Sequence, residues 1–169
     1  MEYNKTILLI EDEADLVQLI KFRLQTRGYE VVAAYDGIEA LEKLNEVSPD
    51  LIILDINLPK MSGIEFYNKI STPHGHSKYP VLVLTARRDL EMTFKNIEAD
   101  GFMAKPFEID QLIIEIERII KAVPSQVIFL IDFKESSHVQ EITAYLKSER
   151  YAVVNLDDFA VLQEKAKEK

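Results

Sequence analysis

Short apolar runs alternate with segments of helical periodicity along residues 1–123. The runs are bounded by turn residues, a pattern typical of strands buried on both faces. They predict strands at Thr6–Ile10, Val31–Ala34, Leu51–Leu54, Val81–Leu84 and Phe102–Ala104. In the segments between them, apolar residues recur every three or four positions. These segments predict helices at Ala14–Thr26, Gly37–Glu46, Gly63–Ile70, Asp89–Ile97 and Glu108–Ala122.

Strict alternation of strand and helix predicts an α/β fold in which helices cover both faces of a parallel sheet. Because crossovers between parallel strands are right-handed, few strand orders remain possible. We expect the doubly wound, flavodoxin-like order 2-1-3-4-5, in which strands one and three are neighbours. Their carboxyl ends would then flank the crevice where open α/β sheets bind ligands.

Chemically active side chains stand at four of the five predicted strand ends. Glu11 and Asp12 follow the first strand, and Asp55 closes the third. Three converging carboxylates predict a site for a hard divalent cation such as Mg²⁺, with Asp55 as a possible nucleophile. The fourth and fifth strands end in Thr85 and Lys105, whose hydroxyl and ammonium groups suit phosphoryl oxygens. Glu11 could instead serve only as a salt-bridge partner of Lys105.

Taken together and in this order, the motifs resemble the receiver domain of a two-component response regulator. The resemblance covers residues 1–123. It is carried by Glu11-Asp12, Asp55 with Leu58-Pro59, Met61-Ser62-Gly63, Thr85-Ala86 and Lys105-Pro106-Phe107. The resemblance implies that Asp55 is the phosphoacceptor and that Thr85 and Lys105 contact the phosphoryl group. It further implies that Mg²⁺ is held by Glu11, Asp12, Asp55 and the backbone carbonyl of Asn57.

The resemblance also implies a signalling switch rather than an enzyme in the ordinary sense. A sensor histidine kinase or phosphotransfer protein would donate the phosphoryl group, and the receiver would catalyse its own phosphorylation and dephosphorylation. Thr85 would then move toward the phosphoryl oxygens, and Phe102 would turn inward. The surface of the fourth helix, fifth strand and fifth helix would change as a result. We expect a homodimer to form, if at all, through that face or through the C-terminal segment.

Residues 124–169 show a second alternating stretch. It predicts strands at Val127–Ile131 and Tyr151–Asn155 and helices at Ser136–Ser148 and Asp158–Lys167. Leu130-Ile131-Asp132 echoes Leu9-Ile10-Glu11, which is a weak internal repeat. We interpret the segment as a partial receiver-like β-α-β-α extension without a counterpart of Asp55. A domain cut short is favoured over a complete extension that docks on the first domain or pairs between subunits.

Composition excludes several classes of function. The 169 residues are 47% hydrophobic and 29% charged, as expected of a globular protein. The absence of cysteine excludes disulfides and thiol catalysis. No apolar run approaches the roughly 20 residues of a membrane span, and a net charge of −9 argues against nucleic acid as a partner. We therefore expect a cytoplasmic location. His74, His76 and His138 are interpreted as surface residues.

Two other functions fit parts of the pattern. A pseudo-receiver would bind partners through its fold without phosphorylation, but the intact set of Asp12, Asp55, Thr85 and Lys105 argues against it. A phosphatase of the haloacid-dehalogenase type also uses an aspartyl nucleophile. Such phosphatases carry a second Asp two residues later as acid and base, and Asn57 occupies that position here. An amide cannot transfer that proton.

Overall fold

The computed structural model describes residues 5–72, 76–86, 97–122, 127–130 and 152–155. The chain divides into two compact units, Met1–Val123 and Pro124–Lys169. Three predicted helices lie outside the described residues almost entirely: Asp89–Ile97, Ser136–Ser148 and Asp158–Lys167. Within the described residues, no helix has the length and apolar content needed to cross a membrane.

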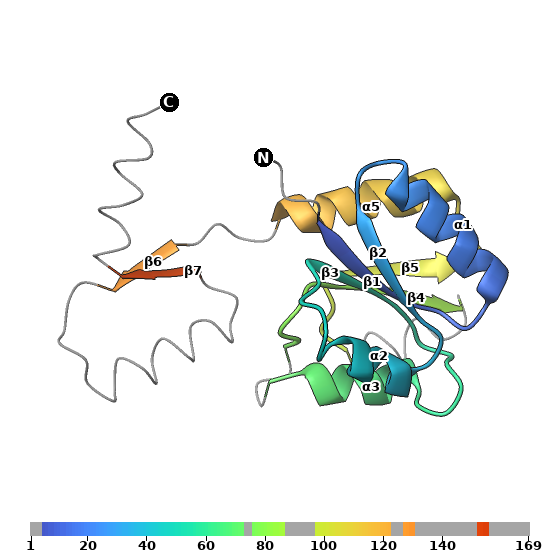
Figure 1. Cartoon of the computed structure of the whole chain (residues 1–169), viewed down its shortest axis with the longest axis horizontal. Helices are drawn as coiled ribbons and strands as arrows, with labels where there is room; N and C mark the ends of the chain where they lie inside the picture. Colours follow the sequence, from blue (N-terminus) through green and yellow to red (C-terminus); the bar gives the residue numbers. More distant parts are fainter. Residues whose placement is uncertain (1–4, 73–75, 87–96, 123–126, 131–151, 156–169) are drawn as a thin grey trace. The chain divides into compact units, whose positions relative to one another are not determined.

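A five-stranded parallel sheet forms the centre of the first unit (Figure 1). Its strands are β1 (Thr6–Ile10), β2 (Glu30–Ala34), β3 (Leu51–Asp55), β4 (Val81–Ala86) and β5 (Gly101–Lys105). They pair in the order β2-β1-β3-β4-β5, so the predicted flavodoxin-like order is confirmed. Every side chain of β3 is buried, which explains why this strand reads as an uninterrupted apolar run.

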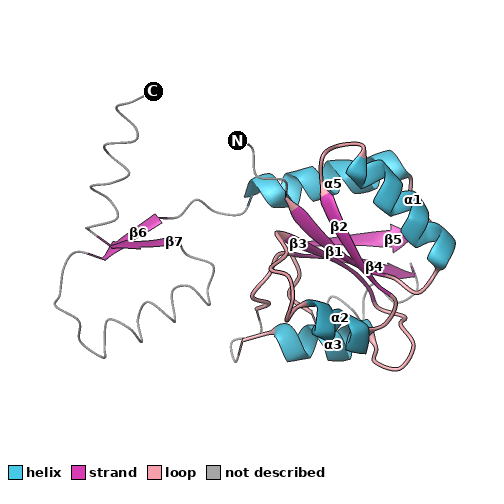
Figure 2. Cartoon of the chain, in the orientation of Figure 1, coloured by secondary structure: helices cyan, strands magenta, loops and turns pink. Residues whose placement is uncertain are grey.

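Helices cover both faces of this sheet (Figure 2). One face carries α1 (Ala14–Gln25) and α5 (Ile109–Ala122), and the other carries α2 (Gly37–Lys43) and α3 (Gly63–Ile70). Two buried clusters result, one on each side of the sheet. The α1/α5 side includes Ile7, Ile20, Leu24, Ile53, Leu84 and Ile116, and the α2/α3 side includes Leu8, Ile52, Leu54, Phe66, Tyr67 and Val83.

Several element ends differ from the sequence prediction, each for a local reason. Helix α2 stops at Lys43 rather than Glu46, because the amides of Asn45 and Glu46 bond to carbonyls only three residues back. Strands β4 and β5 run further than predicted, so Thr85 and Lys105 are the strands' own residues. Helix α1 ends where predicted within one residue.

The end of α1 depends on Gly28, whose φ of 85° is open to glycine at little cost. The amide of Gly28 donates to the carbonyl of Gln25, and that of Tyr29 donates to the carbonyl of Leu24. These two bonds form a Schellman motif, the commonest use of a glycine after a helix. The chain is thereby turned directly into β2.

Two strands are described in the second unit. They are β6 (Val127–Leu130) and β7 (Ala152–Asn155), paired in parallel from Val127 opposite Ala152 to Leu130 opposite Asn155. Both predicted strands are present, and the remaining residue of each prediction, Ile131 and Tyr151, lies outside the described residues. Two parallel strands alone do not support a receiver-like identity for this unit.

Candidate functional site

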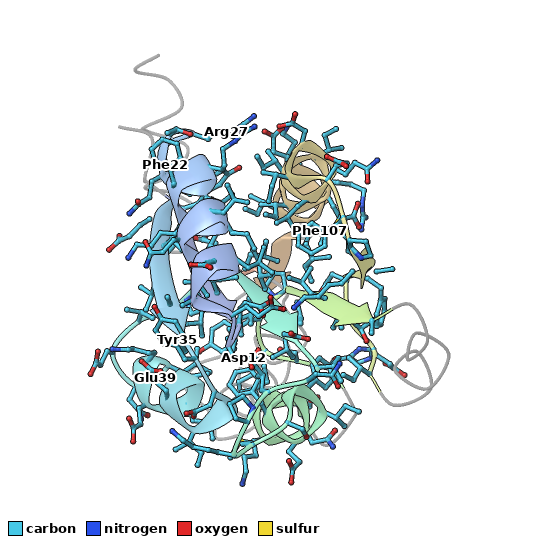
Figure 3. The ribbon with its side chains drawn as sticks, turned by 90° about the vertical axis from the view of Figure 1, so that its right-hand side faces the viewer. Asp12, Phe22, Arg27, Tyr35, Glu39 and Phe107 are labelled. Atoms are coloured by element: carbon cyan, nitrogen blue, oxygen red, sulfur yellow. The ribbon has the colours of Figure 1, made fainter. Side chains whose placement is uncertain are left out.

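The register of the sheet brings the four chemically active strand ends to one edge. Ile10 lies opposite Leu54, so Glu11 follows beside Asp55. Leu84 lies opposite Asp55, so Thr85 comes next on the other side. Figure 3 shows Asp12 near the middle of this edge, with Tyr35 and Glu39 on the side where α2 begins and Phe107 on the side of β5.

Glu11, Asp12 and Asp55 form an acidic cluster. One carboxylate oxygen from each lies within 4.8 Å of the others. Glu11 and Asp55 are buried, whereas Asp12 is exposed. Carboxylate oxygens at this spacing are the donors that a hard cation such as Mg²⁺ takes, and the exposed member leaves room for water ligands. The residues predicted from sequence are therefore brought together in a set that fits the ion.

Lys105 lies between the two buried carboxylates. Its Nζ is 2.6 Å from Oε2 of Glu11 and 2.6 Å from Oδ2 of Asp55, and 3.8 Å from the more exposed Glu13. Burial lowers the pKa of Lys105, but the hydrogen bonds to Asp55 and Glu11 outweigh it and the net pKa is raised. The lysine is therefore a fixed cation at this edge. Glu11 is both its salt-bridge partner and a member of the acidic cluster.

The second oxygen of each buried carboxylate accepts a hydrogen bond from a backbone amide. Oδ1 of Asp55 accepts from the amide of Asn57 at 3.1 Å, and Oε1 of Glu11 accepts from the amide of Glu13 at 3.3 Å. Both carboxylates are thus held at both oxygens, by Lys105 on one side and by their own following turn on the other. Such fixed side chains need little reorganisation before they react or bind.

Burial makes Glu11 hard to ionise. Its pKa is raised to about 7, mainly by loss of water around the carboxyl and further by the charge of Asp55, while Lys105 opposes the shift. A carboxyl with a raised pKa stabilises the fold most when protonated. That stabilisation is full below the unfolded pKa and is lost as the pH rises toward about 7. Below about pH 7, a cation bound by Glu11 would compete with a proton for this carboxyl.

Thr85 carries an unpaired buried hydroxyl. Its side chain is fully buried, and Oγ1 has no hydrogen-bond partner among the described residues. A buried hydroxyl without a protein partner can still donate a hydrogen bond to another group. Its place in β4, directly after the residue paired with Asp55, suits an oxygen of a group attached there.

Phe102 lies on β5 opposite Val83 and is partly buried against the cluster on the α2/α3 side. Its role as a switch aromatic stays a prediction. The metal-capable group found among the described residues contains no histidine. His76 is exposed, with Nδ1 at 3.1 Å from Glu98, and His74 and His138 lie outside the described residues.

Sequence reasoning missed two residues beside the site. Asp36 caps α2 by accepting from the amides of Ile38 and Glu39, and Lys60 forms an ion pair with it. The Asp-Gly pair before a helical pattern is a recognisable N-cap signal. Nothing in the sequence marks Lys60, because its backbone conformation and its partner are visible only in three dimensions.

Residues 7–117 match the family described as "Response regulator receiver domain". A relative, "Alkaline phosphatase synthesis transcriptional regulatory protein PhoP" of Bacillus subtilis (strain 168), is 37% identical over 120 residues, or 70% of this chain and 49% of the relative. The chain therefore belongs to the response regulator receiver family. It spans about half the length of the curated relatives it matches.

Solved structures agree with this assignment. The chemotaxis response regulator CheY4 of Vibrio cholerae is 33% identical, with a TM-score of 0.63 over 69% of this chain and 99% of that one. The receiver domain of the sensor histidine kinase PA1611 of Pseudomonas aeruginosa PAO1 is 27% identical, with a TM-score of 0.61 over 71% of this chain and 100% of that one. That second structure is described with a magnesium ion coordinated in its active site cleft.

Proposed function

We propose that this chain is a phosphorylation switch in which Asp55 accepts the phosphoryl group from a sensor histidine kinase or phosphotransfer protein. The observation that carries the proposal is the setting of the Asp55 carboxylate. It is buried, held by Lys105 and by the amide of Asn57, and grouped with Glu11 and Asp12. A carboxylate fixed among cation ligands and beside an ammonium is equipped for phosphoryl transfer.

Mg²⁺ would be held by Glu11, Asp12, Asp55 and the backbone carbonyl of Asn57. The spacing of the three carboxylates supports this assignment, as does the magnesium described for the related receiver of PA1611. When bound, the ion would neutralise charge on the phosphoryl oxygens during transfer. The chain's own residues supply the remaining contacts.

In the transfer, an oxygen of Asp55 forms a bond to phosphorus as the bond from phosphorus to the donor breaks. The donor leaves with its bonding electrons, as a histidine nitrogen or, for acetyl phosphate, as acetate. Lys105 already touches Asp55 and can follow the new negative charge onto the phosphoryl oxygens. The unpaired hydroxyl of Thr85 can donate to another of these oxygens.

Thr85 and Phe102 would then pass the signal to the surface. We also propose a cytoplasmic location, and a chain in which residues 1–123 form the phosphoacceptor domain and residues 124–169 form a separate segment.

A homodimer would form through the fourth/fifth-helix face or through residues 124–169. Sedimentation of phosphorylated and unphosphorylated chain tests the dimer, and a monomer in both states at high concentration contradicts it.

Phosphorylation by a small donor separates the proposed function from its alternatives. We expect acetyl phosphate with Mg²⁺ to add one phosphoryl group per chain, detected by intact mass. The same chain should show no sustained turnover of p-nitrophenyl phosphate. Steady turnover would indicate a phosphatase, and the absence of any phosphoryl group would indicate a pseudo-receiver.

We expect the Mg²⁺ affinity to rise with pH across neutrality. Glu11, with a pKa of about 7, is mostly protonated at pH 6 and must lose that proton when a cation binds. One released proton makes the affinity about tenfold higher at pH 8 than at pH 6. Calorimetric titration at the two pH values measures this ratio.

The matched control for the pH effect is Glu11→Gln, which keeps the size of the side chain and removes its titration. It should bind Mg²⁺ more weakly and with equal affinity at both pH values. A pH-independent affinity in the unchanged chain contradicts the assignment of Glu11 as a ligand.

A further inference from the structure

The loop between β3 and α3 (residues 56–62, the β3–α3 loop) contains a strained residue that is not glycine. Lys60 has a φ of 62°, in the left-handed region that side chains other than glycine rarely adopt. The amide of Met61 donates to the carbonyl of Pro59 at 2.6 Å, which closes a three-residue turn around Lys60. Strain of this kind persists only where the surrounding structure holds it, and it concentrates at functional sites.

The side chain of Lys60 explains what holds this turn. Its Nζ lies 2.5 Å from Oδ2 of Asp36, the residue that caps α2. The other oxygen of Asp36 accepts from the amides of Ile38 and Glu39, each at 2.9 Å. Asp36 is therefore a buried, fixed anion with a separate partner for each oxygen. Its pKa is lowered, chiefly by the hydrogen bond from Lys60.

Packing next to the ion pair joins the same two segments. A Cβ added to Gly37 would lie 2.9 Å from both Cγ and the carbonyl oxygen of Met61. Such a distance means that the β3–α3 loop touches the first turn of α2 with no space between them. Lys60 therefore contacts Asp36, and the next residue, Met61, packs against Gly37.

Both ends of the β3–α3 loop are hydrogen-bonded next to the acidic cluster. The amide of Gly63 donates to the carbonyl of Ile56 at 3.0 Å, and the amide of Asn57 donates to Oδ1 of Asp55. The loop thus leaves β3 at Asp55 and returns to the same point at Gly63. An interaction that holds Lys60 and Met61, in the middle of the loop, therefore also restrains the backbone of Asp55 and Asn57.

We propose that Lys60 is a positioning residue, which ties the β3–α3 loop to the start of α2 and thereby sets the backbone of Asp55 and Asn57 in the acidic site. This inference rests on the proposed function, because the strained turn matters only if Asp55 and Asn57 bind Mg²⁺ and the phosphoryl group. Lys60 itself would contact neither Mg²⁺ nor the phosphoryl group. It acts through Asp36 and through the loop itself.

The test compares four single variants by Mg²⁺ calorimetry and by amide exchange in the metal-free chain. Lys60→Met removes the charge and keeps the length of the side chain, and Asp36→Ser keeps a helix cap and removes the partner. Lys60→Arg keeps the ion pair. Lys121→Met is the matched control, because Lys121 forms a surface ion pair with Glu117 on α5 at 3.2 Å.

We expect Lys60→Met and Asp36→Ser each to weaken Mg²⁺ binding by about tenfold, the usual effect of removing an outer support of a metal site. The double variant should be no weaker than either single one, since both remove the same contact. Lys60→Arg should stay within about twofold of the unchanged chain, as should Lys121→Met. The melting temperature should fall further in Lys60→Met than in Lys121→Met, because Lys60→Met leaves the buried carboxylate of Asp36 without its cation.

Amide exchange keeps this inference separate from the proposed function. In the metal-free chain, the amide of Gly63 should exchange about tenfold faster in Lys60→Met and Asp36→Ser than in Lys121→Met. Unchanged exchange together with Mg²⁺ affinities within twofold of the unchanged chain overturns the role of Lys60. If the unchanged chain binds no Mg²⁺, the proposed function fails, and the exchange rate alone then decides whether Lys60 positions the loop.

Discussion

Replacing Asp55 with Asn is expected to abolish phosphorylation by acetyl phosphate. The amide is close in size to the carboxylate but is not a nucleophile, so no bond to phosphorus forms. We expect the rate of phosphoryl incorporation to fall by about a thousandfold or more, as for other removed nucleophiles. Intact mass after incubation with acetyl phosphate and Mg²⁺ measures the loss. The fold should survive, because Lys105 keeps its partner Glu11.

The control for this variant is Asp15→Asn. Asp15 is an exposed acid in the first turn of α1, so its loss changes the net charge equally without touching the acidic cluster. It should be phosphorylated at the rate of the unchanged chain. Incorporation in Asp55→Asn at the unchanged rate would show that another residue accepts the phosphoryl group.

Among Gly→Ala variants at the glycines that the structure describes, Gly63→Ala is expected to lose the most stability. An added Cβ would lie 2.8 Å from Cα of Ile56 and even closer to the carbonyl oxygen of Asp55. Both contacts are to backbone, so no side chain can move aside, and α3 must shift away from the end of β3. We expect a cost of about 3 kcal/mol in the free energy of unfolding, measured by denaturant titration. Phosphorylation should slow in the same variant, because the backbone of Asp55 moves.

Gly28→Ala separates this steric effect from ordinary backbone strain. Gly28 has a positive φ, but an added Cβ there meets nothing within 4 Å. The expected cost is only about 1 kcal/mol, from the left-handed conformation alone. Phosphorylation should be unaffected, since Gly28 lies at the far end of α1. Equal losses of stability in the two variants would refute the close approach of Gly63 to β3.

Sequence patterns predicted the sheet because its three central strands, β1, β3 and β4, are buried apolar runs closed by turn residues. Parallel pairing then places Asp55 beside Glu11 and Thr85 without further information. The chemistry at the strand ends was therefore visible in the sequence. The positions of Thr85 and Lys105 inside the strands were not, since ladder hydrogen bonds rather than apolar content decide where β4 and β5 end.

The sequence predicted only some of the contacts between distant side chains. The ion pair between Lys105 and Glu11, 94 positions apart, was expected as one possible role of Glu11. The ion pair between Lys60 and Asp36, 24 positions apart, was not predicted. The raised pKa of Glu11 follows from burial, which no residue pattern reports. The left-handed turn at Lys60 also has no local signal, because lysine is not a residue that favours positive φ.

The central claim is that this chain accepts one phosphoryl group, at Asp55, in a reaction that needs Mg²⁺. Its most direct test is to incubate the unchanged chain with acetyl phosphate, reduce the acyl phosphate with borohydride, and locate the modified residue by peptide mass spectrometry. We expect modification at Asp55 alone, and none when Mg²⁺ is replaced by a chelator. Modification at any residue other than Asp55, including Glu11 and Asp12, or equal modification without Mg²⁺, would contradict the claim.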